Sequence, residues 1–304
     1  MAFAAFSTNA APVEAAPKKR SWIAPFLLLP GLAYLSLFFL VPLVALLLTS
    51  FQATEFGPLG KEFVYAFQWE NYVQAINEYM PHIGRSFFYS ITATIFALLI
   101  GYPLAYLMGV TLRDFPMWKS LVLMLVIAPF FFSFLLRALA WKQLFADSGP
   151  IVGILNMLGL FGPGDYLNGT DFSVIFGLTY TFIPFMALPI YTSLDRLDIR
   201  YLEAAGDLYG KPATNFWKVT IPLSMPGIVS GTLLTFIPAS GDYINASNMF
   251  LGSPSTAMIG NVIESNYLIT QNFPIAAALS ISLMAVILVA VSIYIRRSGT
   301  EDLL

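Results

Sequence analysis

The sequence predicts an all-α polytopic membrane protein with six transmembrane helices, and three observations indicate this fold class. Hydrophobic residues make up 58% of the 304 residues and charged residues only 11%, with a mean hydropathy of +0.74. This composition is unlike that of a water-soluble domain. Six apolar runs are each long enough to cross a hydrocarbon core, which takes roughly 20 residues. The basic residues concentrate in alternate connections between these runs, as in polytopic membrane proteins.

The predicted spans, in chain order, are residues 24–49, 86–109, 119–141, 172–193, 226–246 and 274–295. The first run follows Lys18, Lys19 and Arg20 and is too long for a signal-peptide core, so we expect it to be retained as a span. Pro129 and Pro238 interrupt the third and fifth runs. A membrane helix tolerates such breaks when neighbouring helices or water satisfy the freed carbonyls, so the breaks indicate a bundle that encloses a path.

The distribution of Lys and Arg orients the spans. One side of the membrane collects eleven of these residues, and the other side has only Lys61, Arg85 and Lys142. The side rich in Lys and Arg is expected to be cytoplasmic, which places both termini in the cytoplasm. The prediction is a disordered N-terminal segment at residues 1–21, a permease domain at residues 22–297 and a C-terminal tail at residues 298–304. Within the permease domain we expect an ordered outer segment at residues 50–85 and a cytoplasmic loop at residues 195–222.

The loop between the fourth and fifth spans has its own helical pattern. Asp195 and Asp198 lie where a helix over residues 199–209 would begin, and Gly210 followed by Pro212 would end it. A second, aromatic helix follows and is expected to stop before the fifth span. Two short helices at an angle could dock in a groove of another protein. On these features alone, an interfacial hairpin that only links two spans is an equal alternative.

A motif in this loop decides between the two interpretations. Glu203, Ala204 and Ala205, followed by the sequence VTIP at residues 219–222, have the spacing of the EAA loop. In this respect the chain resembles the membrane subunits of bacterial ABC importers. In that family the loop docks in a cleft of the cytosolic ATPase and transmits ATPase closure to the spans, which implies that residues 203–205 belong to a coupling helix. Tyr209 stands where the family usually has glycine and Gly210 follows it, so we expect the turn one residue later.

Further strings are similar to the spermidine/putrescine permeases, specifically to the first of their two membrane subunits: GYPLAY, SFLLRALAW, PFMALPIYTSL and GTLLTFIPASGDY, at residues 101–106, 133–141, 184–194 and 231–243. The resemblance implies a type I ABC importer permease bundle in the bacterial inner membrane. It also implies three protein partners: a homologous second permease subunit, a cytosolic ABC ATPase dimer that binds the ATP and Mg²⁺, and an extracytoplasmic substrate-binding protein.

A polycation that crosses an apolar bundle requires carboxylates and aromatic faces. Asp242 is the only acid inside a predicted span, and Tyr243, Tyr180 and Phe182 are aromatic candidates for the path. A structural ion pair between Asp242 and Arg137 is an equal alternative, because buried charges normally find partners.

Catalysis in this chain is not expected. The sequence has no G-x-x-x-x-G-K-[ST] phosphate loop, no cysteine and a single histidine, so no catalytic residues, cofactor or metal site are predicted. No basic stripe indicates nucleic acid. Three alternatives stay open: a permease of the same class for another solute, for which Arg137 would be the better candidate if the solute is an anion; a secondary transporter; and an intramembrane enzyme.

Overall fold

The computed structural model describes residues 23–57, 60–162, 164–209 and 211–297. The N-terminal segment expected to be disordered, the predicted C-terminal tail and Gly210 lie outside the described residues. The chain divides into two units at Ala45, and each is described by itself.

The first unit is one helical run. It contains α1 (Ile23–Leu35), η1 (Ser36–Leu40) and the beginning of α2 (Val41–Ser50). Every side chain from residue 27 to residue 42 is exposed, although nearly all of them are apolar. Leu27–Ser50 is long and apolar enough to cross a bilayer, so we expect lipid or apolar protein surface around it.

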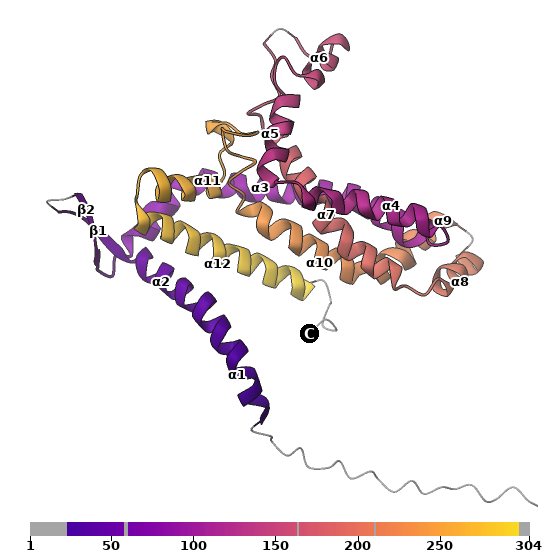
Figure 1. The fold of residues 1–304 in the computed structure, drawn as a ribbon, viewed down its shortest axis with the longest axis horizontal. Helices are drawn as coiled ribbons and strands as arrows, with labels where there is room; N and C mark the ends of the chain where they lie inside the picture. The colour runs from indigo at the N-terminus through magenta and orange to yellow at the C-terminus, as the bar shows by residue number, and fades with distance from the viewer. Residues whose placement is uncertain (1–22, 58–59, 163, 210, 298–304) are drawn as a thin grey trace, which may run out of the picture. The chain divides into compact units, whose positions relative to one another are not determined.

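The second unit begins with the end of α2, which an antiparallel hairpin and then further helices follow (Figure 1). Its elements are β1 (Gln52–Gly57), β2 (Gly60–Tyr65), α3 (Glu70–Tyr106), η2 (Leu107–Thr111), α4 (Pro116–Ile127), η3 (Ala128–Phe131), α5 (Phe134–Leu144), α6 (Pro150–Met157), α7 (Asp171–Asp195), α8 (Arg200–Tyr209), α9 (Pro212–Asn215), η4 (Phe216–Thr220), α10 (Ile221–Ser240), η5 (Pro254–Thr256), α11 (Ile259–Glu264), η6 (Ser265–Ile269) and α12 (Phe273–Arg297).

The core of this unit lies among α3, α7 and α10, and α12 packs mainly against α3. Small residues allow the helices to approach closely. A Cβ atom at Gly227 of α10 would lie 2.7 Å from the carbonyl oxygen of Pro189 in α7, and one at Gly109 would lie 2.9 Å from the Cβ of Leu194. Close approach through glycine is typical of membrane helices, which lack a hydrophobic driving force between them and associate by tight packing.

The described residues contain five helices that could cross a membrane, or six if α4–η3 and α5 form one bent span. This agrees with the predicted fold class. The interruption expected near Pro129 is present, because Ala128–Phe131 is a 3₁₀ turn and the chain bends by 98° before α5. Pro238, in contrast, lies inside α10 without breaking it, so that prediction was wrong.

Three helix boundaries also differ from the prediction. The second spanning helix begins at Glu70, so the expected outer segment is the hairpin together with the first turns of α3. The aromatic helix of the loop does not stop before the fifth span, because Pro212–Ser240 is one continuous helix. That helix ends at Ser240, and Asp242 therefore follows the span and does not lie within it.

Candidate functional site

The helix α8 presents the Glu-Ala-Ala sequence. Glu203 and Ala204 are exposed, whereas Ala205 is only 5% exposed and Leu202 is half-buried. The buried side of α8 packs against α9 and η4. The helix therefore has a fixed inner face and an open outer face that carries Glu203. Tyr209 is the last residue of α8, one residue before the undescribed Gly210.

Polar contacts hold the segment that enters α8. The ammonium group of Lys119 lies 2.5 Å from the carboxylate of Asp195, the last residue of α7. Arg113 donates hydrogen bonds to the carbonyl oxygens of Leu197, at 2.9 Å, and Asp195, at 3.3 Å. Asp198 accepts a hydrogen bond from the backbone N–H of Arg200 at 3.0 Å, as expected of a residue at a helix start. Asp195 does not start that helix, because it ends α7 and pairs with Lys119.

Aromatic contacts hold the segment that leaves α8. The ring of Phe216 in η4 meets the rings of Tyr102 and Tyr106 edge to face, with centroids 5.5 and 5.9 Å apart. The hydroxyl groups of Tyr102 and Ser224 are hydrogen-bonded at 3.0 Å. The segments on both sides of α8 are thus connected to α3, α4, α7 and α10.

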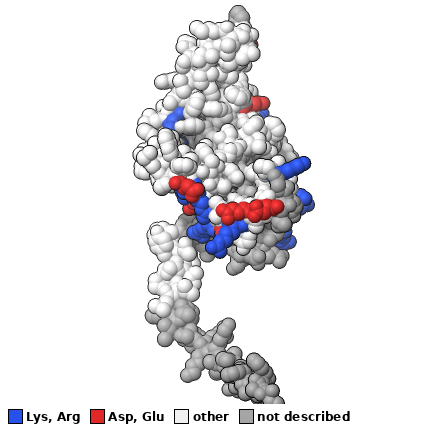
Figure 2. All heavy atoms as spheres, turned by 90° about the vertical axis from the view of Figure 1, so that its right-hand side faces the viewer, with Lys and Arg blue, Asp and Glu red and all other residues white. Residues whose placement is uncertain are grey.

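Charged residues gather at this end of the bundle. Figure 2 looks onto it and shows Lys and Arg side chains beside Asp and Glu side chains, with a mostly uncharged surface above them. The sequence of the connections here contains eight basic residues and five acidic ones, which are Arg113, Lys119, Arg196, Arg200, Lys211, Lys218, Arg296 and Arg297, and Asp114, Asp195, Asp198, Glu203 and Asp207.

Asp242 lies near the opposite end of the bundle, two residues beyond α10. Its side chain is 8% exposed, and its carboxylate accepts hydrogen bonds from the backbone N–H of Asn245 at 2.7 Å and from the Asn245 amide at 3.1 Å. Burial raises the pKa of Asp242 to about 6, although the hydrogen bonds from Asn245 act in the opposite direction. The carboxylate therefore closes the turn that follows α10.

The ion pair between Asp242 and Arg137, one of the two alternatives that the sequence left open, is not found among the described residues. No ion pair or hydrogen bond joins these two side chains in the described part of the chain. Arg137 lies in α5, beyond the bend of the third span, where its guanidinium group lies 5.7 Å from the centre of the Phe134 ring. Its Nε atom is buried without a hydrogen-bond partner.

The three aromatic candidates occupy different environments. Tyr243 is 47% exposed, and its carbonyl oxygen accepts a hydrogen bond from the Asn261 amide. Phe182 is 7% exposed and belongs to the core. Tyr180 is half-buried and meets the ring of Trp141 edge to face, with centroids 5.2 Å apart. Of these side chains, Tyr243 is the one that is open to a ligand.

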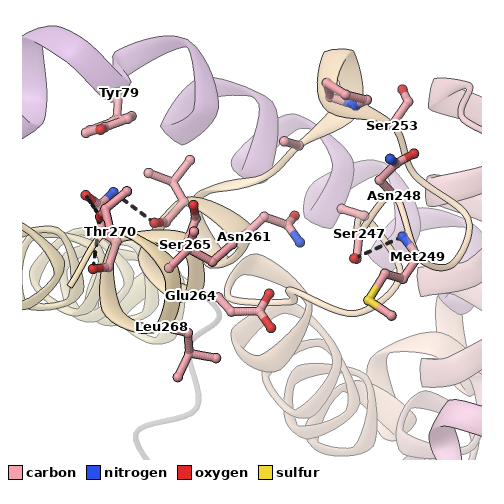
Figure 3. Close-up of a pocket in the computed structure, with 16 residues that line it drawn as sticks. Tyr79, Ser247, Asn248, Met249, Ser253, Asn261, Glu264, Ser265, Leu268 and Thr270 are labelled. Carbon is pink, nitrogen blue, oxygen red and sulfur yellow. Dashed lines mark hydrogen bonds between the residues drawn. The ribbon is translucent and has the colours of Figure 1, made fainter. Parts of the chain in front are cut away.

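A cleft of about 550 Å³ lies next to this region and was not predicted. It is lined by the loop after α10, by α11 and η6, and by Tyr79 of α3 (Figure 3). Its lining includes one carboxylate, that of Glu264, the last residue of α11. Glu264 was not among the predicted site residues, because it lies between two predicted spans. The sequence did contain an indication that Glu264 has a role, because it is the only charged residue between Asp242 and Arg296.

Comparisons with known proteins agree on one family. Residues 101–297 match the family described as the inner membrane component of binding-protein-dependent transport systems. The chain is 36% identical over 267 residues to the spermidine/putrescine transport system permease protein PotB of Haemophilus influenzae, an alignment that covers 87% of this chain and 90% of that protein.

Two solved structures share the fold. One is a bacterial ABC transporter involved in the import of the acidic polysaccharide alginate, with 18% identity, a TM-score of 0.66, and coverage of 93% of this chain and 97% of that chain. The other is a bacterial alginate ABC transporter in complex with an alginate pentasaccharide-bound periplasmic protein, with 21% identity, a TM-score of 0.59, and coverage of 93% and 96%. At these identities the structures show a common fold alone.

Proposed function

The chain belongs to the family of inner membrane components of binding-protein-dependent transport systems, and on this premise we propose that it is the permease subunit of an ATP-driven polyamine importer. Its substrate would be spermidine, putrescine or a similar polyamine. The observation that carries the substrate class is the similarity to PotB, which extends over most of both chains. As a member of this family the chain is a transport subunit of the bacterial inner membrane.

The energy for transport would come from a cytosolic ABC ATPase dimer that binds ATP and Mg²⁺. Residues Glu203, Ala204 and Ala205 on α8 would enter a groove of this partner, with the α8 turn at Tyr209 and Gly210 beside it. The exposed face of α8 and the contacts at both of its ends favour this role, because docking there would move the helices to which α8 is attached. The excess of basic residues at this end favours a cytoplasmic location for it and for both termini.

The other partners follow from surfaces that this chain leaves open. The described side chains of α1 and the exposed apolar side chains of η3, including Phe131 at 84% exposure, would be covered by lipid or by a homologous second permease subunit. A periplasmic protein occurs in one of the two similar complexes, and we infer that a substrate-binding protein docks at the end that carries α11. The path for the substrate would run between the two permeases.

Among the path candidates, we assign contact with the substrate to Tyr243, because its ring is exposed and an aromatic face attracts ammonium groups. Asp242 would hold the turn that presents Tyr243. Tyr180 and Phe182 would shape the bundle beside the path, since the structure packs both rings against neighbouring aromatic side chains.

A permease of the same class for a different small solute is the alternative. The test is uptake of labelled spermidine by proteoliposomes that contain this chain, its partner permease, the ATPase and the binding protein. We expect uptake that requires ATP and stops when the ATPase is omitted. An intact complex that hydrolyses ATP in response to its loaded binding protein, but does not accumulate spermidine or putrescine, would refute the polyamine assignment and favour the alternative.

A further inference from the structure

The cleft beside α11 contains a carboxylate without a partner. Glu264 is half-buried, and Figure 3 shows its carboxylate directed across the cleft toward Ser247 and Met249. Among the residues that the structure describes, no group forms a hydrogen bond or ion pair with the Glu264 carboxylate. A partly buried carboxylate is costly unless a cation or several donors reach it. Glu264 is therefore available to a cationic ligand.

The remaining lining suits a ligand that alternates charge and hydrocarbon. Ser247, Asn248 and Tyr79 offer oxygen atoms that can accept hydrogen bonds, and the Tyr79 ring offers an aromatic face. Val262 and Leu268 supply apolar surface. The volume of about 550 Å³ lies within the range of small-molecule sites. An alkyl chain with ammonium groups along it would satisfy both kinds of surface.

Positively charged side chains already bind the backbone around this cleft. Lys142 donates hydrogen bonds to the carbonyl oxygens of Asn248, at 3.2 Å, and Met249, at 2.9 Å. Lys61 donates one to the Thr270 carbonyl at 2.9 Å, and Arg85 donates one to the Ala257 carbonyl at 2.8 Å. All four acceptors belong to residues that line the cleft. These carbonyl oxygens are thus occupied by the chain's own cations, and none of the three cations forms a hydrogen bond or ion pair with Glu264 in the described part of the chain.

The net charge of the surrounding segments also attracts cations. Residues 51–90, 132–175 and 241–275, which form the connections at this end of the spans, contain nine carboxylates and four Lys or Arg residues. An excess of carboxylates over this whole end raises the local concentration of cations there, although Lys61, Arg85 and Lys142 lie at the cleft itself. The opposite end, where α8 lies, has an excess of basic residues, so the two ends differ in sign.

We propose that this cleft binds one end of a polyamine, with the Glu264 carboxylate accepting hydrogen bonds from a terminal ammonium group. The methylene groups of the ligand would lie against Val262 and Leu268, and Tyr243, whose backbone is hydrogen-bonded to Asn261 of α11, would be next along the route. This inference rests on the proposed function and adds to it a first binding site on the permease itself, before the path through the bundle.

The test compares Glu264→Gln with Glu55→Gln in the assembled transporter. Both variants remove one negative charge from the same end, but Glu55 is an exposed residue of β1 that is absent from the cleft lining. Binding of labelled spermidine to the purified complex, without binding protein, is measured at several salt concentrations, and ATP-dependent uptake is measured in parallel. A Glu264→Asp variant keeps the charge and tests its position.

We expect Glu264→Gln to weaken spermidine binding about tenfold or more, as for loss of a hydrogen bond to a charged group. Glu55→Gln should change binding less than twofold, and Glu264→Asp should restore part of the affinity. Equal binding by wild type and Glu264→Gln would overturn the proposal. So would a variant that binds spermidine normally but loses binding-protein docking, because Glu264 would then serve a protein lysine or arginine. Wild-type complex that takes up no polyamine would instead refute the proposed function.

Discussion

The ammonium group of Lys119 lies 2.5 Å from the carboxylate of Asp195, and this ion pair joins the start of α4 to the residue at which α7 ends. Arg113 adds two hydrogen bonds to the backbone beside it. The next helix along the chain is α8, which carries Glu203. The pair thus ties α4 to the end of α7, a few residues before α8 begins at Arg200.

Replacing either partner of this pair is expected to uncouple transport. Lys119→Ala or Asp195→Ala should lower spermidine uptake several-fold while ATP hydrolysis continues, because α8 would no longer move α4 and α7 together. The side chains are 21% and 36% exposed, so the loss of stability should stay below about 1 kcal/mol. Uptake and hydrolysis are measured on the same proteoliposomes.

The matched control exchanges the two charges. Lys119→Asp combined with Asp195→Lys should recover part of the uptake that each single substitution removes, since the attraction is restored with its sign reversed. A double variant that is no better than the single variants would show that the ion pair does not act in coupling.

Glu203→Lys is expected to weaken association with the ATPase. The side chain is exposed, so the stability of the permease should change little, while the new charge would meet a groove that accepts a carboxylate. Co-purification of the ATPase and ATP-dependent uptake are the readouts, and Glu62→Lys, an exposed change on β2, is the control. Unchanged co-purification and uptake would remove the coupling role of Glu203.

Gly227→Ala should destabilise the permease by about 1–3 kcal/mol, as overpacking generally does. The added Cβ would lie 2.7 Å from the Pro189 carbonyl oxygen and from the Ser193 Cβ, so α7 and α10 would have to separate. Thermal unfolding of the purified complex measures the effect. Gly153→Ala in α6, where nothing lies within 4 Å, should leave the unfolding temperature nearly unchanged. Equal effects of both substitutions would contradict the close-packing argument.

The stability of the complex should depend on pH through Asp242. Its pKa is about 6 in the folded protein, whereas the ordinary pKa of an aspartate side chain is 3.8. The folded state therefore binds the proton more tightly than the unfolded state does. The resulting stabilisation is fully present below about pH 4 and is lost as the pH rises through about 6.

Asp242→Asn should remove this dependence, so the difference in unfolding temperature between variant and wild type should change between about pH 4 and pH 6. A difference that is constant over this interval would show that Asp242 does not titrate there. Uptake by the folded variant should stay near the wild-type value if, as we propose, the carboxylate serves to hold the turn at Asn245.

The existence and approximate order of the spans were predictable because crossing a hydrocarbon core imposes a length and a composition on the chain itself, whereas their ends were not. The bend near Pro129 was predictable for a similar local reason, since proline lacks the N–H that an α-helix needs. Pro238 also lacks the N–H group, yet it does not break its helix: α10 continues for two residues beyond Pro238 and then ends.

The partners of charged side chains were not predictable. Asp242 and Arg137 are suitable by residue type, yet Asp242 closes a local turn with Asn245, and Arg137 lies beyond the bend in α5. Glu264 was overlooked because a carboxylate in a connection is ordinarily solvated. Its setting is defined by α3, α11 and the loop after α10, which come together only in the folded chain.

By itself the sequence determined that this protein crosses the membrane several times and carries a helix with the Glu-Ala-Ala motif, because hydropathy and short motifs are properties of consecutive residues. Only the tertiary structure decided that Lys119 contacts the segment before α8 and that Phe216, after α8, packs on Tyr102. It also decided that Asp242 is buried and that Glu264 faces a cleft. Those properties depend on contacts between residues far apart in the chain, and the packing of α3, α7 and α10 brings such residues together.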